Sequence, residues 1–110
     1  MSSPPGTAVE EFADAQEIDV AAGQPFAVLL SGNGAGGYRW RVAELPAPVA
    51  IRGEDDVAPA RGAPGATGVK RFELEAREAG TFTLRFELVR DWEPGPADAR
   101  ELTLRVRAGP

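Results

Sequence analysis

The chain has 110 residues with a hydrophobic content of 43%, which is enough for one modest core and too little for two domains. It carries 17 acidic and 12 basic residues, for a net charge of −5, and the basic residues are scattered singly, which argues against a nucleic-acid partner. Cysteine and histidine are both absent, which excludes a disulfide, a thiol nucleophile and any catalytic mechanism centred on histidine.

These absences predict a protein that is not an enzyme and that needs no metal or cofactor. No apolar run approaches the roughly 20 residues needed to cross a bilayer, so no membrane association is expected. The N-terminus lacks the basic segment and the apolar stretch of a signal peptide. The expected location is secreted or periplasmic if a leader has been removed, and cytoplasmic otherwise. The excess of Arg over Lys, with abundant Ala, Gly and Pro, indicates a bacterium with a GC-rich genome.

Residues 1–8 are rich in Ser, Pro and Gly, and are predicted to form a disordered tail or a segment added for expression. A single domain is expected over residues 9–108. Its first part alternates only weakly and has a possible break at residues 13–15, which predicts short edge strands with Phe12, Ile18 and Val20 as buried anchors. A tight turn is predicted at residues 21–24.

The strand expected at residues 25–31 alternates apolar and polar positions, and its buried face consists of Phe26, Val28 and Leu30. A glycine-rich loop follows at residues 32–37. In residues 38–42 the large aromatic side chains then point one way and the arginines the other. Trp40 is therefore predicted to lie in the core. Tyr38 either supports the base of the loop or touches a partner.

Prolines predict a corner at residues 46–48, and a short strand is expected at residues 49–52. Residues 53–68 lack periodicity and form the longest predicted irregular stretch, which is either a binding loop or a mobile insertion. The acidic run at residues 54–56 is consistent with calcium binding, since hard cations prefer clustered carboxylates. Because the alternating spacing of known calcium loops is missing, a solvated acidic turn is the preferred interpretation.

Residues 69–90 show the clearest strand pattern in the chain. Apolar positions recur every second residue on both sides of a short connection at residues 77–80: Phe72, Leu74 and Ala76 before it, and Phe82, Leu84, Phe86 and Leu88 after it. Gly80 can adopt the positive φ that a tight turn needs. The pattern predicts an antiparallel hairpin whose two open ends lie side by side.

After a Pro- and Gly-containing loop at residues 93–99, a final strand is expected at residues 101–107, with Leu102, Leu104 and Val106 facing inward. No helical window of useful length and no internal repeat is present. About seven or eight short strands separated by turn signals predict an all-β, immunoglobulin-like sandwich.

The order of the strands predicts where their connections lie. If successive strands run alternately up and down, the connections after Ser31, Arg52 and Arg90 emerge at one end of the sandwich, and the three tight turns emerge at the other. The first set is longer and rich in glycine, with aromatic residues at its margins. Three such loops at one end form a candidate recognition surface.

Each of these loops carries a short motif. The first loop contains Asn33-Gly34-Ala35-Gly36-Gly37-Tyr38, with Trp40 behind it; the second contains Gly65-Ala66-Thr67-Gly68, and the third contains Arg90-Asp91-Trp92. In order and spacing, along roughly residues 18–107, these motifs resemble the chagasin-like inhibitors of papain-type cysteine proteases. That family carries an Asn-Pro-Thr-Thr-Gly-Tyr/Phe loop followed by Trp, then a Gly-x-Gly-Gly loop and an Arg-Pro-Trp/Phe loop.

The resemblance implies a monomeric, reversible, non-covalent inhibitor that blocks the active-site cleft of a papain-like cysteine protease. Residues 33–37 would form the tip of the wedge beside the catalytic cysteine, residues 65–68 one flank, and Arg90 with Trp92 the other. Glycine lets a backbone approach a narrow site closely, and Trp and Arg are enriched at interface hot spots.

The motifs also depart from the family pattern. Residues 34–36 replace Pro-Thr-Thr, and each glycine costs about 0.5–1 kcal/mol more to order than an alanine, so weaker or slower inhibition is expected. Asp91 stands where the family has Pro, and its charge should favour a basic cleft wall. Thr67 stands where a glycine is expected.

Less specific interpretations remain open at this stage. The glycines of the first loop are also consistent with a permissive turn. Arg90 would form only a surface ion pair with Glu93 or Asp91, whereas Trp92 is predicted to be an exposed contact. The alternative function is an immunoglobulin-like binding or adhesion module that recognises carbohydrate or another protein through the same loops. An enzymatic function, such as paired-carboxylate glycoside chemistry, has no preferred residues.

Overall fold

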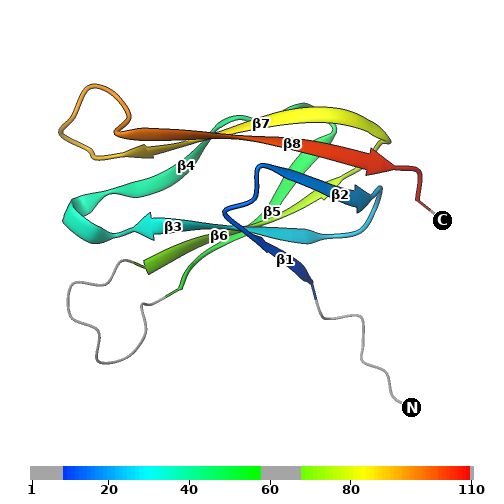
Figure 1. Cartoon of the computed structure of the whole chain (residues 1–110), viewed down its shortest axis with the longest axis horizontal. Coiled ribbons are helices and arrows are strands. Elements are labelled where there is room, and N and C mark those ends of the chain that lie inside the picture. The colour runs from blue at the N-terminus through cyan, green and yellow to red at the C-terminus, as the bar shows by residue number, and fades with distance from the viewer. Residues whose placement is uncertain (1–8, 58–67, 110) are drawn as a thin grey trace, which may run out of the picture.

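A computed structural model describes residues 9–57 and 68–109 of the chain. These residues form eight strands in two facing sheets (Figure 1). The strands are β1 (Glu10–Ala13), β2 (Glu17–Ala21), β3 (Phe26–Asn33), β4 (Arg39–Glu44), β5 (Val49–Val57), β6 (Gly68–Ala76), β7 (Gly80–Val89) and β8 (Asp98–Arg107). The predicted all-β sandwich is confirmed. The 3₁₀ turn η1 (Ala35–Gly37) lies between β3 and β4.

One sheet has the strand order β1-β3-β6-β5 and the other has the order β2-β8-β7-β4. The pairs β1–β3 and β2–β8 are parallel, and the other neighbouring pairs are antiparallel. Strands β1 and β2 are therefore edge strands of different sheets, as the weak pattern of this segment predicted. The break between them is Asp14, whose φ is 51°.

The core lies between the two sheets, where the apolar positions of the alternating strands meet. Phe72 of β6 and Phe86 of β7 face each other with their ring centroids 5.4 Å apart, and both are buried. Trp40 is 2% exposed, which confirms that it is a core residue. Its indole Nε1 donates a hydrogen bond to the carbonyl oxygen of Ser31 at 2.9 Å. Within the described part of the chain, no polar or charged residue is fully buried.

The prediction that residues 69–90 form a hairpin is wrong. Strands β6 and β7 belong to different sheets, and the chain crosses from one sheet to the other at residues 77–79. The alternation of apolar and polar residues shows which side chains a strand buries. Two successive strands show the same alternation whether they pair edge to edge in one sheet or face each other across a core. Here β6 pairs with β3 and β5, and β7 pairs with β4 and β8, so the backbone hydrogen bonds of both strands are used elsewhere.

The prediction of a short strand at residues 49–52 followed by an irregular acidic turn is also wrong. Strand β5 continues to Val57, and its acidic residues lie opposite the basic residues of β6. Lys70 lies 3.3 Å from Glu54 and 3.4 Å from Asp56, and Arg71 lies 3.6 Å from Asp55. These cross-strand charge pairs stabilise strand residues that have little intrinsic preference for a sheet. No cluster that could hold a metal ion occurs among the residues that the structure describes.

Long connections lie at one end of the sandwich and tight turns at the other (Figure 1). We call the first the loop end. It contains the first loop (residues 32–38), the third loop (90–97) and the ends of β5 and β6 that flank residues 58–67, which lie outside the described residues. The strand registers agree with this, since Asn33 pairs with Gly68 and Arg39 pairs with Val89. The parity prediction is confirmed for the first and third loops and for the strand ends that flank the second.

Three tight connections form the opposite end, which we call the turn end: residues 22–25, 45–48 and 77–79. The main chain closes these turns. Gln24 N–H donates to Ala21 C=O at 3.2 Å, and Val49 N–H donates to Pro46 C=O at 2.9 Å. Across residues 9–57 and 68–109, no helix has the length and apolar character needed to span a membrane.

Candidate functional site

The first loop leaves β3 through a break in the pairing register between Ser31 and Asn33. It is folded back on itself because Gly34 N–H donates to the carbonyl oxygen of Tyr38 at 2.6 Å. Gly34 has a φ of 97° and Gly37 a φ of 83°, values that residues with a side chain rarely adopt. The glycines of this motif are therefore required by a specific turn and are not merely tolerated.

The third loop places Trp92 against the first loop. Its side chain is 68% exposed, as predicted, yet one edge of the indole covers Gly37. A Cβ atom added at Gly37 would lie 2.6 Å from Cη2 of Trp92, closer than any real contact. Glycine at position 37 is therefore what allows the two loops to touch.

Arg90 connects the aromatic residues of the two loops. Its guanidinium lies 4.2 Å from the ring centroid of Tyr38 and 5.2 Å from that of Trp92, within the range of cation–π attraction. It also donates a hydrogen bond to the carbonyl oxygen of Gly36 at 3.4 Å. Tyr38, which is half-buried, thus supports the base of the first loop through Arg90.

Arg90 also forms the ion pair with Glu93 that the sequence suggested as one of two options. This hydrogen bond raises the pKa of Arg90 and lowers the pKa of Glu93. The pair holds the third loop together, since Glu93 N–H also donates to the carbonyl oxygen of Arg90 at 3.1 Å. Arg90 therefore does more than form a surface ion pair, because it links the two loops.

Asp91 pairs with Arg39 on β4. Both side chains are more than half exposed, so the pair contributes little to stability. The pair does place the positive charge of Arg39 beside the negative charge of Asp91, the residue that stands where the chagasin-like inhibitors have Pro. Arg39 is not one of the site residues predicted from the sequence. The available signal was its place directly after Tyr38, on the polar face of a strand that borders the third loop.

The second motif is only partly described. Gly65, Ala66 and Thr67 lie outside the described residues, and Gly68 is the first residue of β6, paired with Asn33. The structure therefore brings together the first and third motifs directly, through Gly36, Gly37, Tyr38, Arg90 and Trp92. It places the end of the second motif beside the first.

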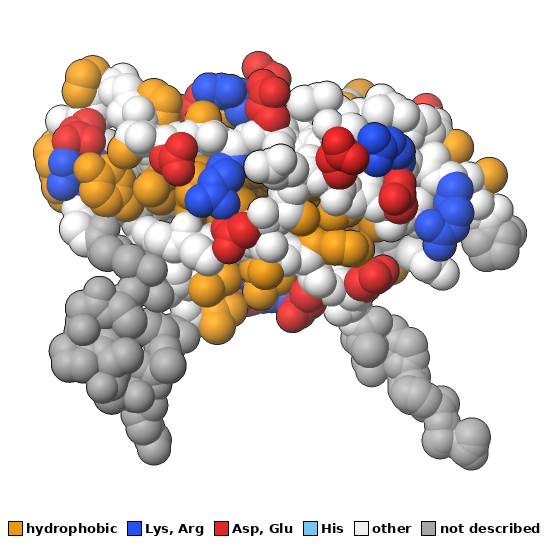
Figure 2. Space-filling view, viewed as in Figure 1, with side chains coloured by type: hydrophobic (Ala, Val, Ile, Leu, Met, Phe, Trp, Pro, Cys, Tyr) orange, Lys and Arg blue, Asp and Glu red, His pale blue; other side chains and the backbone are white. Residues whose placement is uncertain are grey.

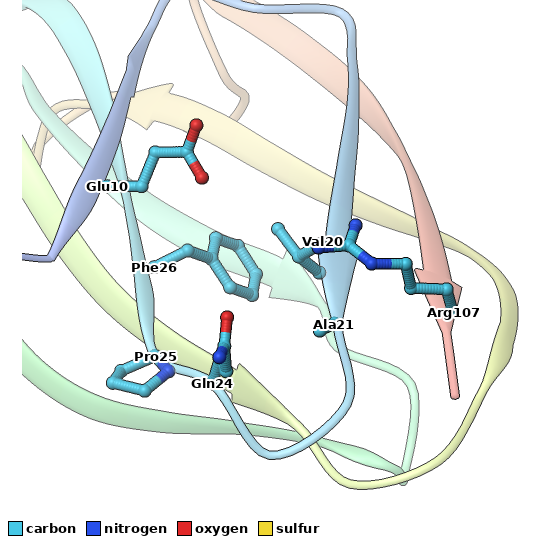
Figure 3. Close-up of a pocket in the computed structure, with 7 residues that line it drawn as sticks. All are labelled: Glu10, Val20, Ala21, Gln24, Pro25, Phe26 and Arg107. Atoms are coloured by element: carbon cyan, nitrogen blue, oxygen red, sulfur yellow. The ribbon is translucent and has the colours of Figure 1, made fainter. Parts of the chain in front are cut away.

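A separate hollow of about 370 Å³ lies at the turn end, between the edge strands β1 and β2 (Figure 3). Phe26 points into it from β3, with Glu10 on one side and Arg107 on the other. On the face shown in Figure 2, acidic and basic side chains are interspersed, so neither sign of charge dominates that face. Neither feature adds a reacting group to the loops.

One known protein family matches most of the chain. The model of the chagasin family, described as chagasin family peptidase inhibitor I42, matches residues 19–106. The chain belongs to the chagasin family of peptidase inhibitors. It is accordingly an inhibitor and not an enzyme, and the resemblance drawn from the three motifs is confirmed. No curated protein sequence matches the chain.

Solved structures share the fold of this chagasin-family chain. The crystal structure of EhICP2, a cysteine protease inhibitor from Entamoeba histolytica, superposes with a TM-score of 0.73 at 17% identity, covering 94% of this chain and all of that one. The solution structure of amebosin gives a TM-score of 0.66 at 24% identity, covering 92% of this chain and 98% of that one. The predicted immunoglobulin-like fold is confirmed.

Proposed function

We propose that this inhibitor acts on papain-like cysteine proteases, reversibly and without a covalent step, by filling the active-site cleft with the three loops that carry the motifs. Residues 33–37 would form the tip, residues 65–68 one flank and residues 90–92 the other. EhICP2, which shares the fold, is itself a cysteine protease inhibitor. The chain contains no cysteine that could form a disulfide with the catalytic thiol of a protease.

The observation that carries the proposal is the contact between the first and third loops. Trp92 covers Gly37 and Arg90 lies over Tyr38, so two segments more than 50 residues apart form one surface. A surface assembled before binding loses less conformational entropy when it docks, which favours affinity. This assembly offsets part of the entropy cost expected from a glycine-rich tip.

Trp92 is the main candidate for a binding hot spot. It is the most exposed of the large hydrophobic residues that the structure describes, and nothing in the fold needs that exposure. Tryptophan and arginine are the residue types most enriched at such positions. Asp91 would favour a basic cleft wall, although Arg39 offsets part of its charge.

Titration of active papain with the purified protein tests the proposal. We expect loss of peptidase activity at micromolar or lower inhibitor, and recovery of activity after dilution. The variant Trp92→Ala should weaken inhibition by about 30-fold or more, as a hot spot of about 2 kcal/mol implies, while the fold remains intact. Leu45→Ala is the matched control, because Leu45 is also an exposed large hydrophobic residue but lies at the turn end.

Full papain activity at high concentrations of folded protein would contradict papain-like specificity. Equal inhibition by wild type and Trp92→Ala would instead show that the third loop is not part of the binding surface.

We further propose a bacterial origin, supported by the excess of Arg over Lys. The proposed location is secreted or periplasmic if a leader has been removed, and cytoplasmic otherwise.

A further inference from the structure

Ser31 is the last residue of β3 before the register break that leads into the first loop, and side chains from elsewhere in the chain hold its main chain. Its N–H donates to Asp14 Oδ1 at 3.1 Å, and its hydroxyl donates to Asp14 Oδ2 at 2.7 Å. Its carbonyl oxygen accepts the hydrogen bond from Trp40 Nε1 at 2.9 Å. Both main-chain polar groups of Ser31 are thus fixed at the entrance to the loop.

Asp14 reaches Ser31 because β1 ends one residue earlier. The last β1–β3 pair is Ala13 with Leu29, and Asp14 N–H then donates to the carbonyl oxygen of Leu29 at 2.8 Å. Its φ of 51° turns the chain away toward β2 while its carboxylate continues along β3. Asp14 is the one residue other than glycine with a positive φ in the described ranges. Such a conformation carries a conformational cost and is retained where the surroundings require it.

Arg100 completes the arrangement from the other sheet. Its Nη1 donates to Asp14 Oδ1 at 2.7 Å, and its guanidinium lies 5.3 Å from the ring centroid of Trp40. Arg100 follows closely after the third loop, near the start of β8. Asp14 therefore links the strand that enters the first loop with the strand that leaves the third.

We propose that Asp14 and Arg100 are positioning residues for inhibition, which hold Ser31 and thereby fix the first loop in its binding conformation. This inference rests on the proposed function. Neither residue belongs to the three motifs. The residues proposed to contact the protease all follow Ser31 in the chain, so Asp14 would act on them only through Ser31. Burial raises the pKa of Asp14, but the hydrogen bonds from Ser31 and Arg100 outweigh it, so the pKa lies below its usual value.

The test compares Asp14→Ala and Arg100→Gln with Glu17→Gln. The control removes the ion pair between Glu17 and Arg105, whose charged atoms lie 3.0 Å apart. Like the pair of Asp14 and Arg100, it joins the N-terminal segment to β8, but both of its residues lie within strands and outside the loops. Two readouts are needed: amide hydrogen exchange of Gly34 and Gly37, with Gly23 at the turn end as the internal reference, and the dissociation constant for papain. Both readouts are taken under conditions in which every variant is fully folded. A loss of stability then cannot be mistaken for a loss of loop positioning.

We expect faster exchange at Gly34 and Gly37, unchanged exchange at Gly23, and about a tenfold weaker dissociation constant, as the loss of one charge-assisted hydrogen bond would give. Glu17→Gln should match the wild type in both readouts. Wild-type exchange at the two loop glycines in folded Asp14→Ala and Arg100→Gln would overturn the inference. If Asp14→Ala does not fold, Asp14→Asn decides, since it keeps the shape of the side chain and removes one of the two carboxylate oxygens that hold Ser31.

The exchange readout is independent of any protease. If the wild type fails to inhibit papain, the proposed function fails, while faster exchange at the loop glycines in the two variants would still show that Asp14 and Arg100 order the loop. If the wild type inhibits papain and the variants inhibit it equally well, the positioning role is wrong and the proposed function stands.

Discussion

The two ends of the sandwich are held together in different ways. At the turn end, main-chain hydrogen bonds close the connections, such as Arg77 N–H to Pro48 C=O at 2.9 Å and Gly23 N–H to Ala76 C=O at 2.8 Å. At the loop end, side chains hold separate loops to one another: Trp92 on Gly37, Arg90 on Tyr38 and Arg39 with Asp91. Contacts between side chains can be changed by single substitutions without loss of the strands. The fold and the binding surface should therefore respond to different substitutions.

The largest expected effect lies in the core that both ends share. Phe86→Ala removes a ring that is 1% exposed and packs on Phe72, and should lower the free energy of unfolding by about 3–5 kcal/mol. Phe82 is only partly buried, so Phe82→Ala should lower the free energy of unfolding by less than Phe86→Ala does. Urea unfolding of both variants checks this order. An equal loss at Phe82 would show that the core extends farther toward the surface than the sandwich indicates.

Gly37→Ala separates the two ends most sharply. The variant forces a side chain onto a φ of 83° and brings its Cβ to 2.6 Å from Trp92. We expect a stability loss of about 1–2 kcal/mol from the backbone conformation, with clearly weaker inhibition because Trp92 must move. Gly23→Ala is the matched control, since Gly23 has a φ of 84° and open space around it.

The control should lose similar stability and keep full inhibition of papain. Thermal unfolding and inhibition constants measured side by side would show this. If Gly23→Ala weakened inhibition as much as Gly37→Ala, the contact between Trp92 and the first loop would have no separate role in binding.

A smaller effect is expected from the exposed ion pair at the loop end. Asp91→Asn should change the free energy of unfolding by less than about 1 kcal/mol, because both partners are largely solvated. Its effect on association with a protease should be visible mainly as a change in the salt dependence of the on-rate. Glu75→Gln, which removes the same charge at the 2.5 Å pair with Arg52, serves as the control. An identical salt dependence in both variants would mean that Asp91 does not face the partner.

The smallest effect concerns pH. The pKa of Asp14 lies below its usual value of 3.8, so its contribution to stability is present above that value and is lost as the pH falls through the lower pKa of the folded state. The difference in stability between wild type and Asp14→Asn should therefore be largest near neutral pH and shrink at pH values below 3.8. Urea midpoints across this range provide the measurement. A difference that does not change with pH would show that the charge of Asp14 is not what stabilises the bonds to Ser31.

Much of the division between the buried core and the exposed loop end could be predicted from the sequence, because side chains at alternating positions of a strand are buried on one face. The core positions on β3, β6, β7 and β8, the buried Trp40 and the exposed Trp92 all follow from a period of two and from the places where it stops. The order of the strands was enough to bring the first and third loops to one end. The motifs on those loops were enough to indicate the family.

Two features could not be predicted, and both depend on which strands become neighbours. Strands β6 and β7 carry the same alternation whether they pair or face each other, so the crossing between sheets leaves no local signal. In the sequence, the acidic residues of β5 have the pattern of a loop. Their place in a strand depends on Lys70 and Arg71 of β6, which lie beside them only in the folded sheet. Asp14 is a similar case, since its carboxylate acquires a role only through Ser31 and Arg100, which are distant in sequence.

Mapping the contact surface by NMR tests the central claim most directly. Papain would be added to the ¹⁵N-labelled protein, and the backbone amides and the Trp92 indole N–H followed. We predict that the perturbed signals are those of Gly34, Gly36, Gly37 and Trp92 at the loop end, while those of Gly23 and Gln24 at the turn end stay unchanged. Perturbation confined to the turn end, with the loop end unaffected, would contradict the account.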